Sequence, residues 1–191
     1  MKKSLTVLLI ATFAAGGVYA QTAIYKVDPT HTHATWEAKH FGTSTSRGHW
    51  DKTEGEITLD KAAKTGKAEI TIDMATINTG VAPFNTHLKS DVFFDVANHP
   101  TAKFVGDKFK FEGDKVTEVT GTMSIRGKSN PAVMKAVSFN CYDHPALKRE
   151  VCGGDFETVI KRSLYGVNWG LSNFATTDDV KVSIQVEAIK Q

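Results

Sequence analysis

Cysteine is scarce in this 191-residue chain, which has only Cys141 and Cys152, and several signatures of catalysis are missing altogether. The chain has no Gly-x-Ser-x-Gly turn that would present a nucleophilic serine, no phosphate-binding loop and no dinucleotide-binding fingerprint. It also has no internal repeats, no low-complexity segments and no interdomain linker. These absences leave a single domain without a recognisable catalytic motif as the starting interpretation.

Long hydrophobic runs are missing too, except for one near the N-terminus that is too short to span about 30 Å of hydrocarbon. Two lysines precede the apolar run Leu5–Ala15, and Val18-Tyr19-Ala20 places small residues where a signal peptidase cuts. We therefore expect residues 1–20 to be a signal peptide that is removed after Ala20. The mature domain, residues 21–191, is expected in the periplasm or secreted. A lipid anchor is not expected, because the cut site has no cysteine to carry it.

An excess of charge of either sign is the third absence. The chain has 23 basic and 21 acidic side chains, and loss of Lys2 and Lys3 with the signal peptide leaves 21 of each. A neutral mature chain argues against a nucleic-acid partner, which would require a basic face. About 170 residues are enough for one domain with one core.

Both cysteines lie in the mature part of the chain. In an oxidising compartment, an even count with a short separation indicates a disulfide, and closing such a loop is worth about 3 kcal/mol. Two free buried thiols, or half of a metal site, are the alternatives.

Apolar and polar residues alternate with period two along much of the chain. The clearest stretch is Val180–Ala188, and Ala34–His40 and Ala68–Met74 repeat the pattern. One dry and one wet face is typical of antiparallel sheet. Further strands are expected at Gly48–Trp50, Glu56–Leu59, Thr101–Val105 with Lys108–Phe111, Val119–Ile125, Met134–Tyr142 and Phe156–Ile160.

Turn signals separate these strands at Asp60-Lys61, Glu112–Asp114, Gly127–Pro131 and Gly153-Gly154. Eight to ten short-connected strands predict a closed barrel or a sandwich, and a barrel of about eight strands can just enclose one ligand. The segment Pro83–Asp95 breaks the pattern with helical spacing, which predicts one or two helical turns over one end of the sheet.

The chain has seven histidines, which are candidate metal ligands. His31 and His33 are two residues apart, a spacing that suits one metal, but their face is expected to be the outer one and a third ligand is missing. Ordinary exposed histidines are the simpler interpretation, and no metal is expected. His40 on an inward face and His87 on the helix could be core groups or polar ligand contacts. Arg162 suits a rim position, where it would pair with an acid or meet a headgroup.

Four ordered blocks of sequence carry a resemblance to a known family. These are YKVDPTHTHATWEAKHFG from Tyr25, INTG from Ile77 with THLKSDVFFDVANHPTAKF from Thr86, GTMSIRGKSNPAV from Gly121 and IKRSLYGVNWG from Ile160. Together they resemble the YceI-like family of polyisoprenoid-binding periplasmic proteins over nearly the whole mature chain. The resemblance implies an all-β, lipocalin-like antiparallel β-barrel whose cavity takes an isoprenoid tail, as in a polyprenyl pyrophosphate or ubiquinone.

One departure from the family pattern bears on the headgroup. Family members usually carry Arg-Asp just before the His-Leu pair, and Phe84 and Asn85 stand near those positions here, which favours a neutral head such as a quinone. The segment from Asn140 to Phe156 resembles a subgroup with a disulfide-closed hairpin.

The expected function is that of a non-enzymatic carrier that requires no cofactor and binds an isoprenoid lipid. An enzyme acting on the bound lipid, or a surface interaction protein with a filled barrel, are the alternatives. Transient contact with a membrane or membrane protein is compatible with the carrier, and the oligomeric state, a dimer included, stays open. The expected cavity lining is Trp36, Phe84, Leu88, Phe94, Phe104, Met123, Ile125, Phe139 and Ile160, with His40, His87 and Arg162 toward the polar end.

Overall fold

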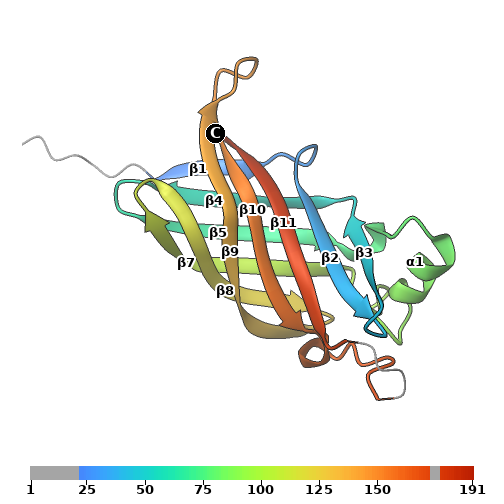
Figure 1. The fold of residues 1–191 in the computed structure, drawn as a ribbon. Helices are drawn as coiled ribbons and strands as arrows, with labels where there is room; N and C mark the ends of the chain where they lie inside the picture. Colours follow the sequence, from blue (N-terminus) through green and yellow to red (C-terminus); the bar gives the residue numbers. More distant parts are fainter. Residues whose placement is uncertain (1–21, 173–176) are drawn as a thin grey trace, which may run out of the picture.

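A computed structural model describes residues 22–172 and 177–191, so the expected signal peptide lies outside the described residues. The described chain is built mainly of antiparallel strands, with one short α-helix and two 3-10 turns (Figure 1). The strands are β1 (Ala23–Val27), β2 (His33–His40), β3 (Ser44–Trp50), β4 (Thr53–Asp60), β5 (Thr65–Asp73), β6 (Ile77–Asn78), β7 (Thr101–Glu112), β8 (Lys115–Ile125), β9 (Lys128–Asp143), β10 (Glu150–Lys161) and β11 (Asp179–Lys190). The helices are η1 (Met74–Thr76), α1 (Ala82–Lys89) and η2 (Arg162–Tyr165). Among these helices, none is long and apolar enough to cross a membrane.

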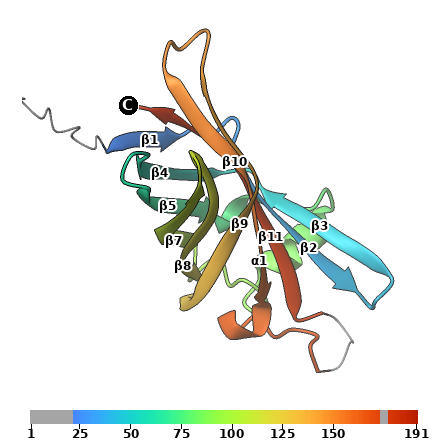
Figure 2. The same cartoon turned by 60° about the vertical axis from the view of Figure 1, so that its left-hand side comes forward.

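Eight strands close into a barrel in the order β1-β4-β5-β7-β8-β9-β10-β11, because β1 pairs with both β4 and β11. The antiparallel β-barrel of about eight strands expected from the sequence is therefore confirmed. The remaining strands β2, β3 and β6 continue outward from the other part of β11. Figure 2 shows β2 and β3 leaning away from β4 and β5.

The division of β11 between two partners determines this shape. Residues Ala188–Lys190 pair with β1, whereas residues Val180–Gln185 pair with β2. Inward residues of β11 keep the alternation seen in the sequence, and Val182, Ile184, Val186 and Ala188 are each at most 5 % exposed. One end of β11 therefore belongs to the closed ring, and the other supports a sheet that flares outward.

A side chain replaces the missing strand at the junction between β1 and β2. The hydroxyl of Thr32, which is 0 % exposed, donates to the carbonyl of Glu187 at 3.2 Å and accepts from its N–H at 3.1 Å. The amide of Asp28 donates to the same carbonyl at 2.8 Å. Because an unpaired backbone group in a buried place is costly, these bonds satisfy β11 where neither β1 nor β2 reaches it.

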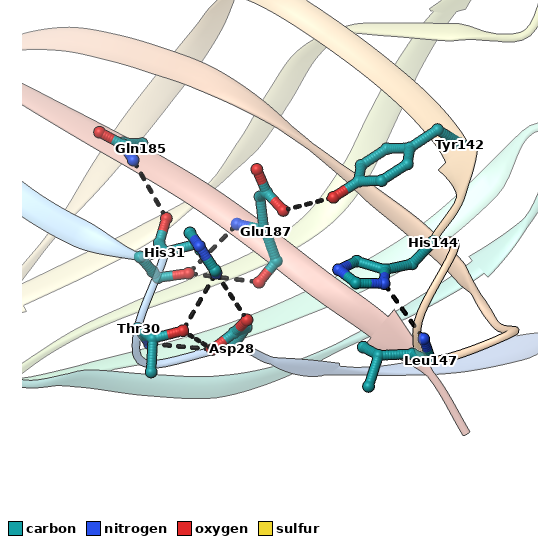
Figure 3. A network of polar contacts seen from close by, with 9 residues as sticks. Asp28, Thr30, His31, Tyr142, His144, Leu147, Gln185 and Glu187 are labelled. Atoms are coloured by element: carbon teal, nitrogen blue, oxygen red, sulfur yellow. Dashed lines mark hydrogen bonds and ion pairs between the residues drawn. The ribbon is translucent and has the colours of Figure 1, made fainter.

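The polar network of Figure 3 surrounds this junction. Nδ1 of His31 lies 2.8 Å from the Asp28 carboxylate, and Tyr142 of β9 donates to the Glu187 carboxylate at 3.1 Å. Burial opposes ionisation of Asp28, but hydrogen bonds from His31 and Thr30 outweigh it and lower the pKa of Asp28 to about 2. His31 is thus an exposed partner of Asp28 in the turn before β2, so it does not share a strand face with His33 as expected from the sequence.

Of the predicted turns, the one at Gly153-Gly154 is wrong, and the one at Gly127–Pro131 is confirmed only at Gly127, which lies in the turn between β8 and β9. Gly153-Gly154 lies inside β10, where a Cβ atom on Gly153 would stand 2.1 Å from the carbonyl oxygen of Val186. The glycines therefore permit close approach of neighbouring strands, and the actual turn follows Asp143. Pro131 belongs to β9, and it is tolerated because β9 pairs with β10 only from Lys135 onward, which leaves one side of Pro131 without a ladder.

Three other elements differ from the sequence expectation. β1 and β6 are strands that the alternation did not reveal, because each is short. The predicted helical segment Pro83–Asp95 is helical only as far as Lys89, within α1, and Ser90 ends it by donating its hydroxyl to the carbonyl of His87 at 2.7 Å.

The predicted disulfide between Cys141 and Cys152 is confirmed. The two residues face each other in the register of β9 and β10, at the base of the hairpin that projects beyond the barrel in Figure 1.

We expect replacement of both cysteines by serine to lower the free energy of unfolding by about 3 kcal/mol, because the bond restricts the unfolded chain. Urea unfolding of this variant and of the reduced wild-type protein should give similar losses, and an unchanged midpoint would contradict a stabilising role.

Thr32→Val should lower the free energy of unfolding by about 2 kcal/mol, because it removes both hydrogen bonds to Glu187 and leaves its N–H without a partner, while its carbonyl keeps the bond from Asp28. Thr53 offers a matched control, since it is also 0 % exposed and its hydroxyl has no partner among the described residues. Thr53→Val should therefore be neutral or stabilising. Equal losses in the two variants would show that the junction bonds carry no special weight.

Candidate functional site

A cavity of about 600 Å³ lies where β2 and β3 flare from the barrel. Its volume is within the range of about 300–1,000 Å³ that holds small molecules and cofactors. Its wall combines β2 and β3, helix α1, the turn that carries Phe93 and Phe94, η2 with the residues that follow it, and the adjoining ends of β8, β10 and β11. The lining residues are Trp36, Ala38, Lys39, His40, Phe41, Ser46, Trp50, Phe84, His87, Leu88, Phe93, Phe94, Ile125, Ile160, Arg162, Tyr165, Val167, Trp169, Thr177, Val180 and Val182.

Aromatic pairs hold α1 and the following turns against the flared strands. Trp36 of β2 meets Phe84 of α1 edge to face at 6.3 Å, and Trp50 of β3 meets Phe94 at 6.1 Å. The amide oxygen of Asn85 accepts hydrogen bonds from the N–H of Thr79 at 2.8 Å and from its hydroxyl at 2.6 Å. Asn85 thus fixes the start of α1 and is not among the lining residues, so of the two departures from the family pattern only Phe84 faces the cavity.

His87 stands in an aromatic surrounding at the wall of the cavity. Its ring lies 4.6 Å from that of Trp169 and 5.2 Å from that of Phe93. Its Nε2 atom is buried and has no hydrogen-bond partner among the described residues. A buried unpaired ring nitrogen costs on the order of 1–3 kcal/mol, so such an atom calls for an explanation by a missing water or ligand.

Arg162 is a buried anchor, which corrects the rim position expected from the sequence. It is 8 % exposed, and its guanidinium donates to the backbone carbonyls of Thr177, Val167 and Trp169, each at 2.9 Å. Burial lowers the pKa of Arg162, and the nearby Asp178 opposes that shift. The bonds tie η2 and the segment after it to the start of β11, so they shape the cavity wall.

A second, smaller cavity of about 60 Å³ occupies the closed part of the barrel. It is lined almost wholly by apolar side chains, which include Phe104 and Phe139. Next to it, Tyr25 donates to Glu150 at 2.5 Å, and Lys61 reaches the same carboxylate at 2.6 Å. Burial first, and then the bond to Glu150, raise the pKa of Tyr25. The two cavities share no lining residue among the described ones, and they differ tenfold in volume.

Among the described residues, the only cluster of three potential metal ligands is Cys141, Glu150 and Cys152. Two of its members form the disulfide, so their sulfur atoms do not serve as thiolate ligands. His31 and His33, the pair considered from the sequence, join no such cluster.

A model of the YceI-like domain matches residues 25–188 of the chain. The chain belongs to the YceI-like family. Curated relatives include UPF0312 proteins of Pseudomonas putida, 30% identical over 195 residues, and of Pseudomonas aeruginosa, 30% identical over 196 residues. The alignments cover 100% of this chain and 99% or 100% of those relatives.

Solved structures agree with membership of the YceI-like family. The YCEI protein of Campylobacter jejuni is 27% identical, with a TM-score of 0.68 over 80% of this chain and 90% of that chain. A polyisoprenoid binding domain from Saccharophagus degradans is 16% identical, with a TM-score of 0.62 over 87% and 98% of the two chains. The second likeness shows the lipocalin-like barrel fold alone.

The structure distributes the residues that were expected from the sequence to line the cavity over both cavities. The larger cavity takes nine of them, the smaller takes Phe104 and Phe139, and Met123 lies in the packed interior outside both. The nine are Trp36, His40, Phe84, His87, Leu88, Phe94, Ile125, Ile160 and Arg162. Sequence reasoning missed Trp50, Phe93 and Trp169, although Phe93 and Trp169 stand inside the matched sequence blocks. Whether these residues bind a ligand stays a prediction.

Arg162→Met should lower the free energy of unfolding by about 3 kcal/mol, because three backbone carbonyls lose their donor. Arg126→Met is the control, since Arg126 also donates to two carbonyls, those of Gly166 and Asp91, but is less buried. Its loss in the same urea titration should be smaller. A stable Arg162→Met protein would instead show that the carbonyls find other partners.

Proposed function

We propose that this protein carries an isoprenoid lipid in the periplasm without transforming it chemically. The observation that supports this most is the cavity of about 600 Å³, whose wall is mainly aromatic and aliphatic. The polyisoprenoid binding domain with the same fold adds support for this class of ligand. The expected signal peptide, residues 1–20, supports export.

Binding in such a cavity comes from burial of the tail. Each CH₂ group taken out of water is worth about 0.8 kcal/mol, so two prenyl units already provide several kcal/mol. The environment that competes with the cavity is a bilayer, in which the tail is about equally well solvated. Loading from a membrane is therefore nearly isoenergetic, and this suits transfer better than storage.

The headgroup favoured by the cavity is neutral, as in a quinone such as ubiquinone, in preference to a polyprenyl pyrophosphate. The buried cation of the wall, Arg162, already donates to three carbonyl groups. His87, whose Nε2 is unpaired among the described residues, can donate one hydrogen bond to a carbonyl oxygen. Lys39 is the remaining cation of the lining, and it is exposed and donates to the hydroxyl of Thr45 at 2.9 Å.

The lining gives less support to an enzyme. An acid–base or nucleophilic mechanism needs a reactive group beside a second group that activates it. The described lining contains no carboxylate and no thiol, and the ring of His40 lies against that of Phe41 at 4.5 Å. His40 and His87 are the candidates that an enzyme would have to use.

Substitutions at Ala38 test whether the cavity holds the prenyl tail, because Ala38 has the smallest side chain among the lining residues. We expect Ala38→Val, Ala38→Leu and Ala38→Phe to shorten stepwise the longest prenyl chain that the protein binds, because each fills more of the cavity. Binding of quinones and pyrophosphates with increasing prenyl number, measured by fluorescence of the lining tryptophans, gives the affinity for each chain.

Affinity should rise with prenyl number and depend less on the headgroup, with the quinone bound at least as tightly as the pyrophosphate. A strong preference for pyrophosphate that vanishes at high salt would contradict the neutral headgroup. Failure of every prenyl compound to bind, in a folded wild-type protein, would contradict the carrier function itself.

A further inference from the structure

The turn between β2 and β3 carries an aromatic residue where the backbone disfavours one. The N–H of Thr43 donates to the carbonyl of His40 at 3.0 Å, and the two central residues, Phe41 and Gly42, both have positive φ, 50° and 69°. Hairpin turns with positive φ at both central positions prefer Asn-Gly. A non-glycine residue in the left-handed region is unfavourable, and a bulky one is an outlier. Phe41 is also 47 % exposed, so burial does not offset this cost.

Phe41 lies at the rim of the large cavity, together with other exposed apolar side chains. Trp169 is 42 % exposed and also belongs to the lining. Leu164, which is 54 % exposed, points outward from η2, whose residues Arg162 and Tyr165 are buried at the cavity wall. We call Phe41, Leu164 and Trp169 the mouth rim. Figure 1 shows the β2–β3 turn and η2 at the same end of the molecule.

Positive charge accompanies the mouth rim. Lys39 bonds to the hydroxyl of Thr45, and Arg126 bonds to two backbone carbonyls, so their charges meet neutral oxygen atoms. Lys128, the first residue of β9, is exposed and lies beside Gly166, which is in the turn after η2. Among the nearby acids, Asp179 pairs with Lys161 at 2.8 Å and Asp178 accepts from Ser163, which leaves Asp91 as the exposed acid. Basic groups therefore outnumber unengaged acids at this end.

We propose that the mouth rim docks on an anionic lipid bilayer, so that the tail passes between bilayer and cavity without crossing water. Exposed aromatic and aliphatic side chains beside basic groups are the composition that binds a membrane interface. Phe41 at the turn tip enters the interface, and this contact compensates for its unfavourable backbone conformation. The inference rests on the proposed carrier function, whose cavity opens at this rim.

The test measures co-sedimentation of the protein with vesicles of phosphatidylethanolamine and phosphatidylglycerol that contain no isoprenoid. Leu164→Gln should weaken association roughly fivefold to tenfold, since it removes one half-exposed aliphatic contact. Leu147→Gln is the matched control, because Leu147 is 46 % exposed but lies in the β9–β10 turn, in the projecting hairpin. An equal loss in the two variants, or no association of the wild-type protein, overturns the proposal.

Phe41→Asn gives a second readout that a purely structural role would not produce. Asparagine suits positive φ, so the thermal midpoint should stay or rise while association with the vesicles falls. A lower midpoint with unchanged association would show that Phe41 serves folding, and would overturn its role in docking.

Binding of a short-chain prenyl quinone in vesicle-free solution separates this proposal from the carrier function. Leu164 is not part of the lining, so Leu164→Gln should bind this quinone as tightly as the wild-type protein. Wild-type protein that binds the quinone but not the vesicles overturns docking alone. Protein that binds vesicles through the rim but no quinone overturns the carrier function and, with it, the purpose proposed for docking.

Discussion

The architecture depends on the way strand β11 shares one edge between two partners. β1 pairs with its last residues and closes the ring, whereas β2 pairs with its first half and carries β3 outward. The hydroxyl of Thr32 bridges the gap by bonding to both backbone groups of Glu187. Had β1 continued along the whole of β11, the barrel would be uniformly narrow. Because β11 pairs with β1 at one end and with β2 at the other, one end of the barrel is narrow and the other is wide.

The two cavities follow from this asymmetry. In the closed part, strands from all sides bring their inward side chains together, and only a void of about 60 Å³ remains. In the flared part, β2 and β3 lie too far from the opposite wall for strand residues alone to fill the space. Helix α1 and the turns after it supply Phe84, Phe93 and Phe94, and the wall still encloses about 600 Å³. The alternative of a barrel filled by its own side chains therefore describes the narrow end only.

Sequence patterns predicted the ring better than the site. Alternation of apolar and polar residues located the long strands, because a strand with one buried face and one exposed face requires that pattern. The cysteine count located the disulfide. The turn expected at Gly153-Gly154 was wrong because glycine serves close strand approach as well as turns. Alternation also shows that a residue faces inward without showing what stands opposite. Met123 and Ile125 lie on the same face of β8, yet Met123 packs in the core and Ile125 lines the cavity.

Arg162 shows a second limit of local sequence. Its neighbours in the chain suggested a rim, but its partners come from residues up to 15 positions away, across a connection that returns to the start of β11. Such a return is a property of the fold and leaves no periodic trace. The same holds for Trp169, which meets His87 and Phe93 only because the chain folds back over α1.

The separation of the two cavities has a consequence for the direction of transport. Val182 lines the large cavity and Ile184, the next inward residue of β11, lines the small one, and no described residue lines both. Under the proposed carrier function, a tail held in the large cavity enters and leaves through the mouth rim. Loading and release then share one opening. Net movement between two reservoirs would then follow their difference in chemical potential, with the protein setting the rate and having no influence on the direction.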